Sequence, residues 1–248
     1  MDFLEQLTSH TSARSFREKA LSEQLKQQLI QAAQSGSSSN FVQAYSIIEV
    51  KNPEKLAEIA TIANFSGYGA EHGVFYLFVA DLNRNYQIAK RANRDLAAFA
   101  SMESFLVSVV DTTIAAQNMT VYAESQDLGI CYIGGIRNDI FRVAEMFNLP
   151  QLTVPLFGMI VGYPNEKNEV KPRLFQDVIV QIDGYQEMEE VTLDNYDAVM
   201  QTYYQQRSNN TQQATWSQKI QEHFKINRRP EVTDFLQKQG FDFFEKNR

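Results

Sequence analysis

Three side chains near the start of the sequence have types and a spacing that suit an anion. His10, Ser12 and Arg14 occupy alternate positions within HTSARSF, and alternate residues of an extended segment point the same way. Three donors on one side could grip a phosphate, with the planar guanidinium of Arg14 forming paired hydrogen bonds. The same residues also suit the region that caps the next helix, with Arg14 on the surface. The spacing by itself leaves both interpretations open.

A second group of cations lies far along the chain. Lys171 and Arg173 flank Pro172, whose ring stiffens the link between them. Two such charges suit a monophosphate or a diphosphate. A solvated basic loop is the plainer alternative, because charged pairs usually lie in solvent.

Two segments of small residues could meet the same ligand. Ser37, Ser38 and Ser39 offer three hydroxyl groups in a loop. Gly134 and Gly135 stand between a predicted strand and a predicted helix, where glycine lets the backbone approach a flat or charged ligand closely. The glycine pair is not the G-x-G-x-x-G fingerprint of dinucleotide-binding folds. A plain polar loop and a simple tight turn are the alternatives.

Other catalytic and metal-binding patterns are missing from the sequence. G-x-S-x-G, H-E-x-x-H, Walker and C-x-x-C motifs do not occur. Cys131 has apolar neighbours and no histidine close in sequence, so we interpret it as a buried small hydrophobe. The three histidines are far apart, and no paired Cys/His spacing indicates zinc. The sequence therefore predicts neither a catalytic dyad nor a metal site.

The composition is that of an ordinary globular protein. The 248 residues carry a net charge of −7, with 44% hydrophobic and 21% charged residues, which argues against a disordered chain or a dedicated nucleic-acid binder. A single cysteine rules out an intrachain disulfide. The first residues lack the basic and apolar regions of a signal peptide, and the most apolar window, 105–116, is too short for a membrane span. We therefore expect a cytoplasmic protein.

The elements that must position these residues alternate between helices and short strands. Apolar periodicity predicts helices over 21–33, 55–63 (begun by Pro53), 86–99, 101–118, 139–147 and 196–204, and an aromatic helix near 235–244. Strands are predicted over 45–50, 74–80, 130–133 and 156–162. The Gln- and Asn-rich stretch 205–213 is the best candidate for a flexible segment. This alternation indicates an α/β or α+β sandwich.

The order of the motifs along the chain is more specific than any one of them. This order resembles that of the NAD(P)H-dependent FMN oxidoreductases, which are the bacterial flavin reductases and oxygen-insensitive nitroreductases. The motifs that carry the resemblance are HTSARSF, the serine loop, FVADLNR, CYIGGIRND, LPQLTVPLFGMIVGYP, KPRL and the tail YYQQRSNN…TWSQKI…RRPEVTDFLQKQGF. The resemblance covers essentially the whole chain. It implies an α+β fold, an α-β-α sandwich with a central, mostly antiparallel sheet and a C-terminal helical extension. It also implies an FMN-binding core over 1–195 and an excursion with the NAD(P)H-binding segment over 196–248.

The resemblance assigns roles by position. The FMN-binding residues that it implies are His10, Ser12, Arg14, Tyr68, Ile133, Gly134, Gly135, Lys171 and Arg173, together with Ser37, Ser38 and Ser39, which in such dimers reach a flavin held largely by the other subunit. Ser66 stands where the family often has glutamine, which puts one hydrogen bond to the flavin ring edge in question. Arg207 is retained in the NADPH-binding segment, but Thr211, Gln212 and Gln213 replace further basic residues. We therefore expect NADPH to be used with modest selectivity and NADH to be accepted.

The chemistry that the resemblance implies is hydride transfer at bound FMN. The cofactor supplies the hydride chemistry and the protein supplies orientation and electrostatics, so no catalytic side chain is required. The expected cycle is ping-pong, from NADPH to FMN and then to a small-molecule electron acceptor such as a nitroaromatic, a quinone or free flavin. A homodimer is expected, because the helix around 102–118 is more apolar than an exposed helix should be. A non-enzymatic flavin-binding or sensor protein, or an unrelated α/β domain, are the alternatives.

Overall fold

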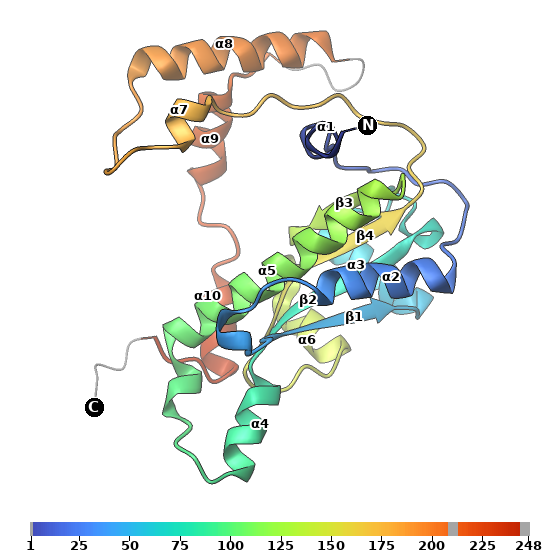
Figure 1. Cartoon of the computed structure of the whole chain (residues 1–248), viewed down its shortest axis with the longest axis vertical. Helices are drawn as coiled ribbons and strands as arrows, with labels where there is room; N and C mark the ends of the chain where they lie inside the picture. Colours follow the sequence, from blue (N-terminus) through green and yellow to red (C-terminus); the bar gives the residue numbers. More distant parts are fainter. Residues whose placement is uncertain (1, 208–212, 244–248) are drawn as a thin grey trace. The chain divides into compact units, whose positions relative to one another are not determined.

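The computed structural model describes residues 2–207 and 213–243, drawn in Figure 1. Contacts divide the chain into two compact units. Unit 1 consists of the residues up to Asn168 together with those from Arg229 onward, and unit 2 is Glu169–Arg228. Unit 2 is therefore an insertion within the sequence of unit 1. The predicted division at 195/196 concerns function rather than contacts, and it stays a prediction.

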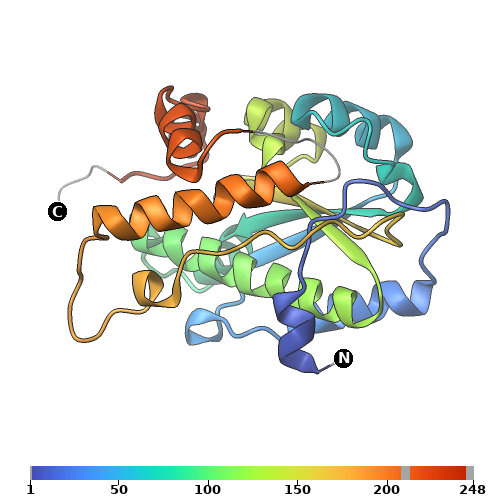
Figure 2. The same ribbon diagram turned by 90° about the horizontal axis from the view of Figure 1, so that it is seen from above.

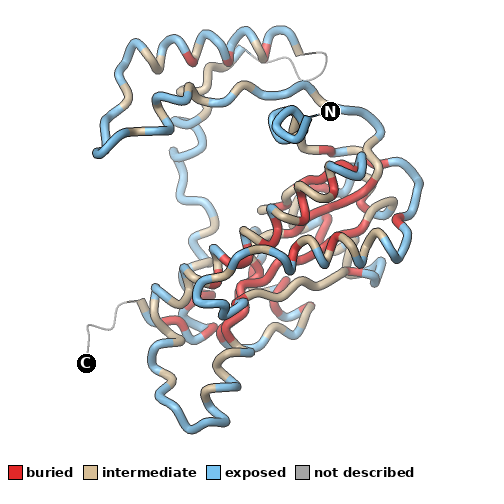
Figure 3. The backbone as a smooth tube through the Cα atoms, in the orientation of Figure 1, coloured by how far each residue is buried: buried red, intermediate tan, exposed pale blue. Residues whose placement is uncertain are grey.

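A four-stranded antiparallel sheet forms the centre of unit 1. In spatial order its strands are β1 (Tyr45–Val50), β2 (Val74–Asp81), β4 (Thr153–Gly162) and β3 (Gly129–Ile133). Every residue of β2 is buried, as a continuous apolar run predicts, and Figure 3 shows buried backbone throughout this region. All four predicted strands are confirmed, although β4 begins at Thr153 rather than at 156. The earlier start includes Pro155, beside an irregularity in the register between Phe78 and Val79.

Helices cover both faces of this sheet. The helices on one face are α2 (Glu23–Gln34) and α5 (Met102–Ser125), and those on the other are α3 (Pro53–Ala63) and α6 (Ile140–Met146). Figure 2 shows the sheet between these two layers. Each layer buries an apolar stripe against the strands, which stabilises the helices more than their own propensities do. The predicted α-β-α sandwich is confirmed.

The connection after β2 departs from the predicted helices. A single helix over 86–99 is wrong, since α4 covers Asn83–Arg91 and a short 3-10 helix, η3, covers Ala97–Ala100. Between them Asn93 adopts a left-handed conformation, with φ at 52°, which asparagine tolerates better than most residues. The next helix, α5, begins after its cap Ser101 but continues beyond the predicted end at 118. Its extra turns bury Met119 and Ala123.

The two sequence ends of unit 1 were predicted less well. A short helix, α1 (Phe3–Thr8), was not predicted. The last helix, α10, covers Glu231–Lys238 rather than 235–244, because the chain turns at Gly240, where φ is 92°. Phe241 nevertheless packs beside Phe105, with ring centres 5.2 Å apart. Phe235 and Phe241 are thus core residues, although Phe241 lies outside the helix, and residue 244 of the predicted helix lies outside the described structure.

Unit 2 contains three helices among its described residues. They are α7 (Gln176–Ile179), α8 (Glu190–Gln206) and α9 (Trp216–Phe224). The predicted helix over 196–204 is the last part of α8, which also takes in two residues of the stretch predicted to be flexible; residues 208–212 of that stretch lie outside the described structure. The sequence analysis missed α9, although Thr215 and Gln218 form a capping box at its start. None of the helices in the described part of either unit is long and apolar enough to cross a membrane.

Candidate functional site

The HTSARSF segment is extended and runs beside β3, the edge strand of the sheet. The Ala13 amide donates to the carbonyl oxygen of Ile130 at 2.8 Å, and Ser12 forms an isolated parallel bridge with the same residue. The next helix, α2, is capped by Ser22. The interpretation of HTSARSF as a helix cap is therefore wrong, and the extended interpretation is confirmed.

His10 and Arg14 meet different partners. His10 Nδ1 lies 2.5 Å from Oε1 of Glu124, near the end of α5. Arg14 is exposed, and within residues 2–207 and 213–243 no carboxylate pairs with it. Its charge acts on Cys131 in β3, but burial is the larger effect and raises the pKa of that thiol above its usual value. Arg14 is therefore a cation available to an anionic ligand, and Cys131 is the buried residue that the sequence predicts.

Three predicted site elements come together on the face of the sheet covered by α3 and α6. Ala13, Tyr68 and Ile133 contribute to one apolar cluster, which joins the HTSARSF segment, the loop after α3 and the end of β3. Tyr68 packs near Phe65, with ring centres 6.1 Å apart. Ser66, beside it, is exposed. Segments that are far apart in sequence thus meet at one place in unit 1.

The two glycines after β3 have different roles. They begin a 3-10 helix, η4 (Gly134–Asp139). A Cβ on Gly134 would meet the guanidinium of Arg137 at ordinary contact distance, 3.4 Å or more, so packing does not require glycine there. A Cβ on Gly135 would lie 2.5 Å from the carbonyl oxygen of Ala63, at the end of α3. Packing alone therefore requires glycine at 135, which neither sequence interpretation anticipated.

Two arginines at this turn were missed by the sequence analysis. Arg137 Nη1 donates to the carbonyl oxygen of Leu156, and Arg229 Nε donates to Oδ1 of Asn138 at 2.9 Å. Burial lowers the pKa of Arg137, and the nearby charge of Arg229 lowers it further. Arg137 follows the glycine pair in YIGGIRND and could have been suspected from that position. Arg229 has no such local signal, because its chain segment returns to unit 1 only after unit 2.

The serine loop is anchored on the other side of the sheet. It includes the 3-10 helix η1 (Ser39–Phe41) and leads into β1. The Ser39 amide donates to Asp111 Oδ1 on α5 at 2.9 Å, and the Gln43 amide donates to Ser38 Oγ at 3.3 Å. These bonds hold the loop in a defined conformation, and the contact of its hydroxyls with a ligand stays a prediction.

The remaining predicted residues belong to unit 2 and surround its aromatic core. Tyr196 Oη donates to the carbonyl oxygen of Pro172 at 3.1 Å, which fixes the turn between Lys171 and Arg173. Lys219 Nζ lies 3.3 Å from the ring centre of Tyr204, and Lys171 Nζ lies 5.8 Å from it. Burial acts to raise the pKa of Tyr204, but hydrogen bonds and charges from these two lysines outweigh it and hold the pKa below its usual value. Unit 2 therefore gathers cations around a buried phenol.

Arg207 lies at the start of the predicted NADPH-binding segment. Its guanidinium carbon is 5.8 Å from the ring centre of Tyr203. Thr211 and Gln212 lie outside the described residues, and Gln213 is exposed. The structure thus provides one arginine at this position of unit 2.

Comparisons with known proteins agree along the whole chain. A family model described as "Nitroreductase family" matches residues 7–163, and one described as "Nitroreductase family, C-terminal domain" matches residues 171–244. The chain is 37% identical over 243 residues to an "FMN reductase (NADPH)" of Bacillus subtilis, covering 96% of this chain and 98% of that one. The structure of the NfrA1 nitroreductase from B. subtilis is similar at a TM-score of 0.91 and 36% identity, covering 97% and 99% of the two chains. The NADPH:FMN oxidoreductase from Vibrio harveyi, solved in complex with NAD+, is similar at a TM-score of 0.86 and 34% identity. The match covers 96% of this chain and 98% of that one.

Proposed function

Because this chain belongs to the nitroreductase family, we propose that it acts as an FMN-dependent oxidoreductase, taking a hydride from NADPH and reducing small-molecule acceptors. The observation that carries the proposal is similarity to an FMN reductase (NADPH) over nearly the full length of both chains. The NAD+ complex of the Vibrio harveyi relative supports NADH as a second donor. Nitroaromatics, quinones and free flavin are the proposed acceptors. The relatives named above are enzymes, so they do not support a non-enzymatic binder.

The residues of unit 1 suit FMN. Arg14 offers an unpaired guanidinium, the natural partner of a phosphate, with Ser12 in the same extended segment. Gly134 has no side chain, which would let a flat ring approach its backbone, near the apolar cluster that includes Tyr68 and Ile133. We propose that these residues hold the cofactor, and that His10 and Gly135 assist as the family pattern implies. The roles of Lys171 and Arg173, which belong to unit 2, stay predictions.

The protein's contribution to the reaction is orientation and charge. The chemistry that FMN supplies when bound is two-electron transfer from a nicotinamide to an acceptor. Arg137 and Arg229 place positive charge beside the glycine turn, where it would stabilise negative charge that develops on a bound ring. Donor and acceptor would use one site in turn.

The test is the absorbance spectrum of the purified protein. We expect a yellow protein that carries FMN, loses its flavin absorbance when NADPH is added without oxygen, and regains it when a nitroaromatic is added. A colourless protein that takes up no FMN would overturn the proposal. A flavin that NADPH and NADH both fail to reduce would support the non-enzymatic alternative instead.

We further propose that the protein is a homodimer. Met102, Leu106 and Val110 form an exposed apolar stripe at four-residue spacing on α5, and Phe41 of the serine loop is exposed as well. A stripe of this kind on one helix is a typical interface feature. The homodimer also brings a serine loop to the flavin site of the other subunit, as the family pattern implies.

Replacing Leu106 by glutamate should weaken the dimer. A charge in an apolar interface has no partner and loses its hydration, so we expect a dissociation constant at least about tenfold higher, equal to about 1.4 kcal/mol. Sedimentation equilibrium would measure it. Thr61→Glu, at an exposed position of α3 on the opposite face of the sheet, is the matched control. Equal dissociation constants for Leu106→Glu and the parent would contradict the interface.

Arg207→Ala should affect NADPH more than NADH. Only NADPH carries the 2′-phosphate, so removing a cation that binds it should raise the KM for NADPH by about tenfold, equal to about 1.4 kcal/mol, and leave the KM for NADH nearly unchanged. Steady-state kinetics with both donors would show this. Arg228→Ala serves as the comparison, because Arg228 is an exposed arginine of the same unit. If that variant alone shifts the NADPH constant, Arg228 rather than Arg207 binds the phosphate.

A further inference from the structure

The serine loop contains an unusual amount of left-handed backbone. Asn40, Phe41 and Gln43 have φ angles of 46°, 57° and 50°, and none of them is glycine. Side chains with a Cβ disfavour this region of the backbone map, so a loop with three such residues among four needs outside support. Local strain of this kind persists only where the surroundings determine it, and it concentrates at functional sites.

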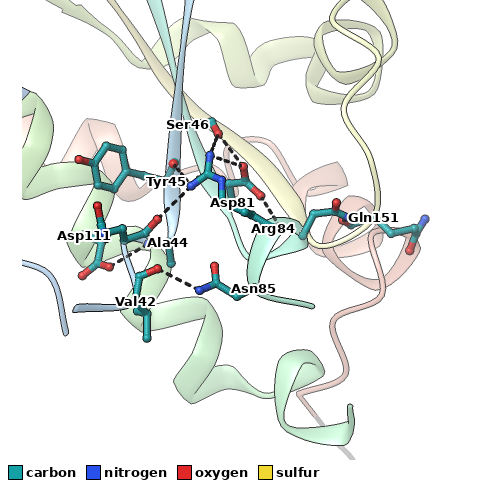
Figure 4. Close-up of polar contacts among 11 residues, drawn as sticks. Val42, Ala44, Tyr45, Ser46, Asp81, Arg84, Asn85, Asp111 and Gln151 are labelled. Carbon is teal, nitrogen blue, oxygen red and sulfur yellow. Dashed lines mark hydrogen bonds and ion pairs between the residues drawn. The ribbon is translucent and has the colours of Figure 1, made fainter. Parts of the chain in front are cut away.

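Asp111 supplies that support from α5. Its side chain is 1% exposed. Oδ1 accepts a hydrogen bond from the Ser39 amide at 2.9 Å, and Oδ2 accepts one from the Ala44 amide at 3.0 Å. These two amides flank the left-handed residues, so one buried carboxylate fastens both ends of the strained stretch. Figure 4 shows Asp111 beside Ala44.

Two residues of α4 hold the middle of the same stretch. Asn85 Nδ2 donates to the carbonyl oxygen of Val42 at 2.9 Å, and Arg84 Nη1 donates to that of Gln43 at 3.3 Å. Arg84 is itself held by the buried carboxylate of Asp81, 3.5 Å away. Figure 4 shows Asn85 beside Val42, and Arg84 beside Asp81 and Ser46. The loop backbone is therefore held by α4 and α5 together.

This support leaves the outward surface of the loop free for another molecule. Phe41 is 80% exposed, although a left-handed residue with a large apolar side chain gains nothing from that position within its own unit. The loop is held on its inner side by α4 and α5, while Ser37, Ser39 and Phe41 are exposed. That combination is typical of a preorganised binding element.

We propose that Asp111 is a positioning residue, which holds the serine loop in its left-handed form before flavin binds. The proposal rests on the proposed function and homodimer, in which this loop contacts FMN at the other subunit. Aspartate suits the role because both of its oxygens accept. Asparagine offers one acceptor and one N–H group, which would face a backbone N–H and repel it.

The test combines a flavin-free measurement with a binding measurement. In flavin-free Asp111→Asn we expect the amides of Ser39 and Ala44 to exchange hydrogen at least about tenfold faster. One of the two amides loses its acceptor, and the other belongs to the same strained loop, which then opens more often. The dissociation constant for FMN should rise by about tenfold. Thr112→Val is the matched control, since Thr112 is a buried neighbour whose hydroxyl donates to the carbonyl oxygen of Ser108 within α5. It should leave both measurements unchanged.

A second substitution separates positioning from general damage. Glycine at position 43 adopts a left-handed φ without strain, so adding Gln43→Gly to Asp111→Asn should restore part of the FMN affinity. A residue that matters only for overall stability would show no such rescue. If Asp111→Asn does not fold, Arg84→Met is the substitute. Arg84 is exposed, and replacing it removes the hydrogen bond to the Gln43 carbonyl oxygen, so we expect faster hydrogen exchange at the Ala44 amide.

Each outcome bears on one proposal. Unchanged amide exchange and FMN affinity in Asp111→Asn, or in Arg84→Met if that variant must be used, would overturn the positioning role. Loss of affinity without rescue by Gln43→Gly would overturn it as well. If the parent protein binds no FMN, the proposed function fails, while the exchange of the Ser39 and Ala44 amides still decides whether Asp111 holds the loop.

Discussion

Replacing Gly135 by alanine is expected to destabilise unit 1 and abolish tight FMN binding. The new methyl group would lie 2.5 Å from the carbonyl oxygen of Ala63 and 2.9 Å from its Cα. Both are backbone atoms, so α3 or the glycine turn must move. Overpacking of this kind costs about 1–3 kcal/mol or more. The melting temperature of the flavin-free protein should fall clearly, and FMN titration should show a large loss of affinity.

The neighbouring glycine is the matched control. A methyl group on Gly134 would meet only the end of the Arg137 side chain, at ordinary contact distance. Gly134→Ala should therefore leave the melting temperature of the flavin-free protein nearly unchanged. If the flavin ring lies against this backbone, as we propose, Gly134→Ala should still weaken FMN binding. Equal melting temperatures for Gly135→Ala and the parent would contradict the packing argument.

Arg14→Ala should have the largest effect on FMN affinity among the exposed cations of unit 1. A hydrogen bond between charged groups contributes about 1.5–3 kcal/mol, so the dissociation constant should rise roughly ten- to 150-fold. Quenching of flavin fluorescence during titration would measure it. The loss should shrink at high salt, because salt screens the attraction between Arg14 and the phosphate in the parent, and the variant lacks this attraction.

Arg17→Ala is the control for Arg14. Arg17 is also exposed and lies three residues further along the same segment, but its Nε donates to the carbonyl oxygen of Pro164 at 2.8 Å. Replacing Arg17 removes the same formal charge as replacing Arg14, but the guanidinium that is lost was already hydrogen-bonded within the protein. We expect a small change in FMN affinity. If both variants bind FMN as tightly as the parent, Arg14 does not hold the phosphate.

The fold was largely predictable because the two central strands of the sheet, β2 and β4, are nearly all buried. Apolar runs such as 74–80 identify strands directly, since burial on both faces leaves no polar positions to confuse the pattern. The helices were harder to bound. The break near Asn93 depends on one residue taking a left-handed conformation, and the extension of α5 to Ser125 depends on packing against the sheet. Neither is visible in local periodicity.

The candidate site divides in the same way. Arg14 and Gly134 were predicted from residue type and spacing, because cationic donors and glycine pairs have local signatures, and their roles stay predictions. The sequence did not predict the roles of Asp111 and Arg229, nor the close packing that requires glycine at 135. Each of these depends on a contact between distant segments. Asp111 is a charged residue within the apolar helix α5, and its carboxylate organises a loop near residue 40. A charged residue inside an apolar helix is therefore worth treating as a sign of buried backbone donors.

The discontinuous build of unit 1 has a consequence for synthesis on the ribosome. One of its apolar clusters combines Ala44, Leu82 and Leu152 with Phe235 and Phe241, and the Leu152 amide donates to the carbonyl oxygen of Gln239 at 2.8 Å. These partners are separated by the whole of unit 2, and translation adds only about 5–20 residues per second. The sheet can therefore form while this cluster is still open, and the nascent chain must keep apolar surface exposed for several seconds until its last partner emerges.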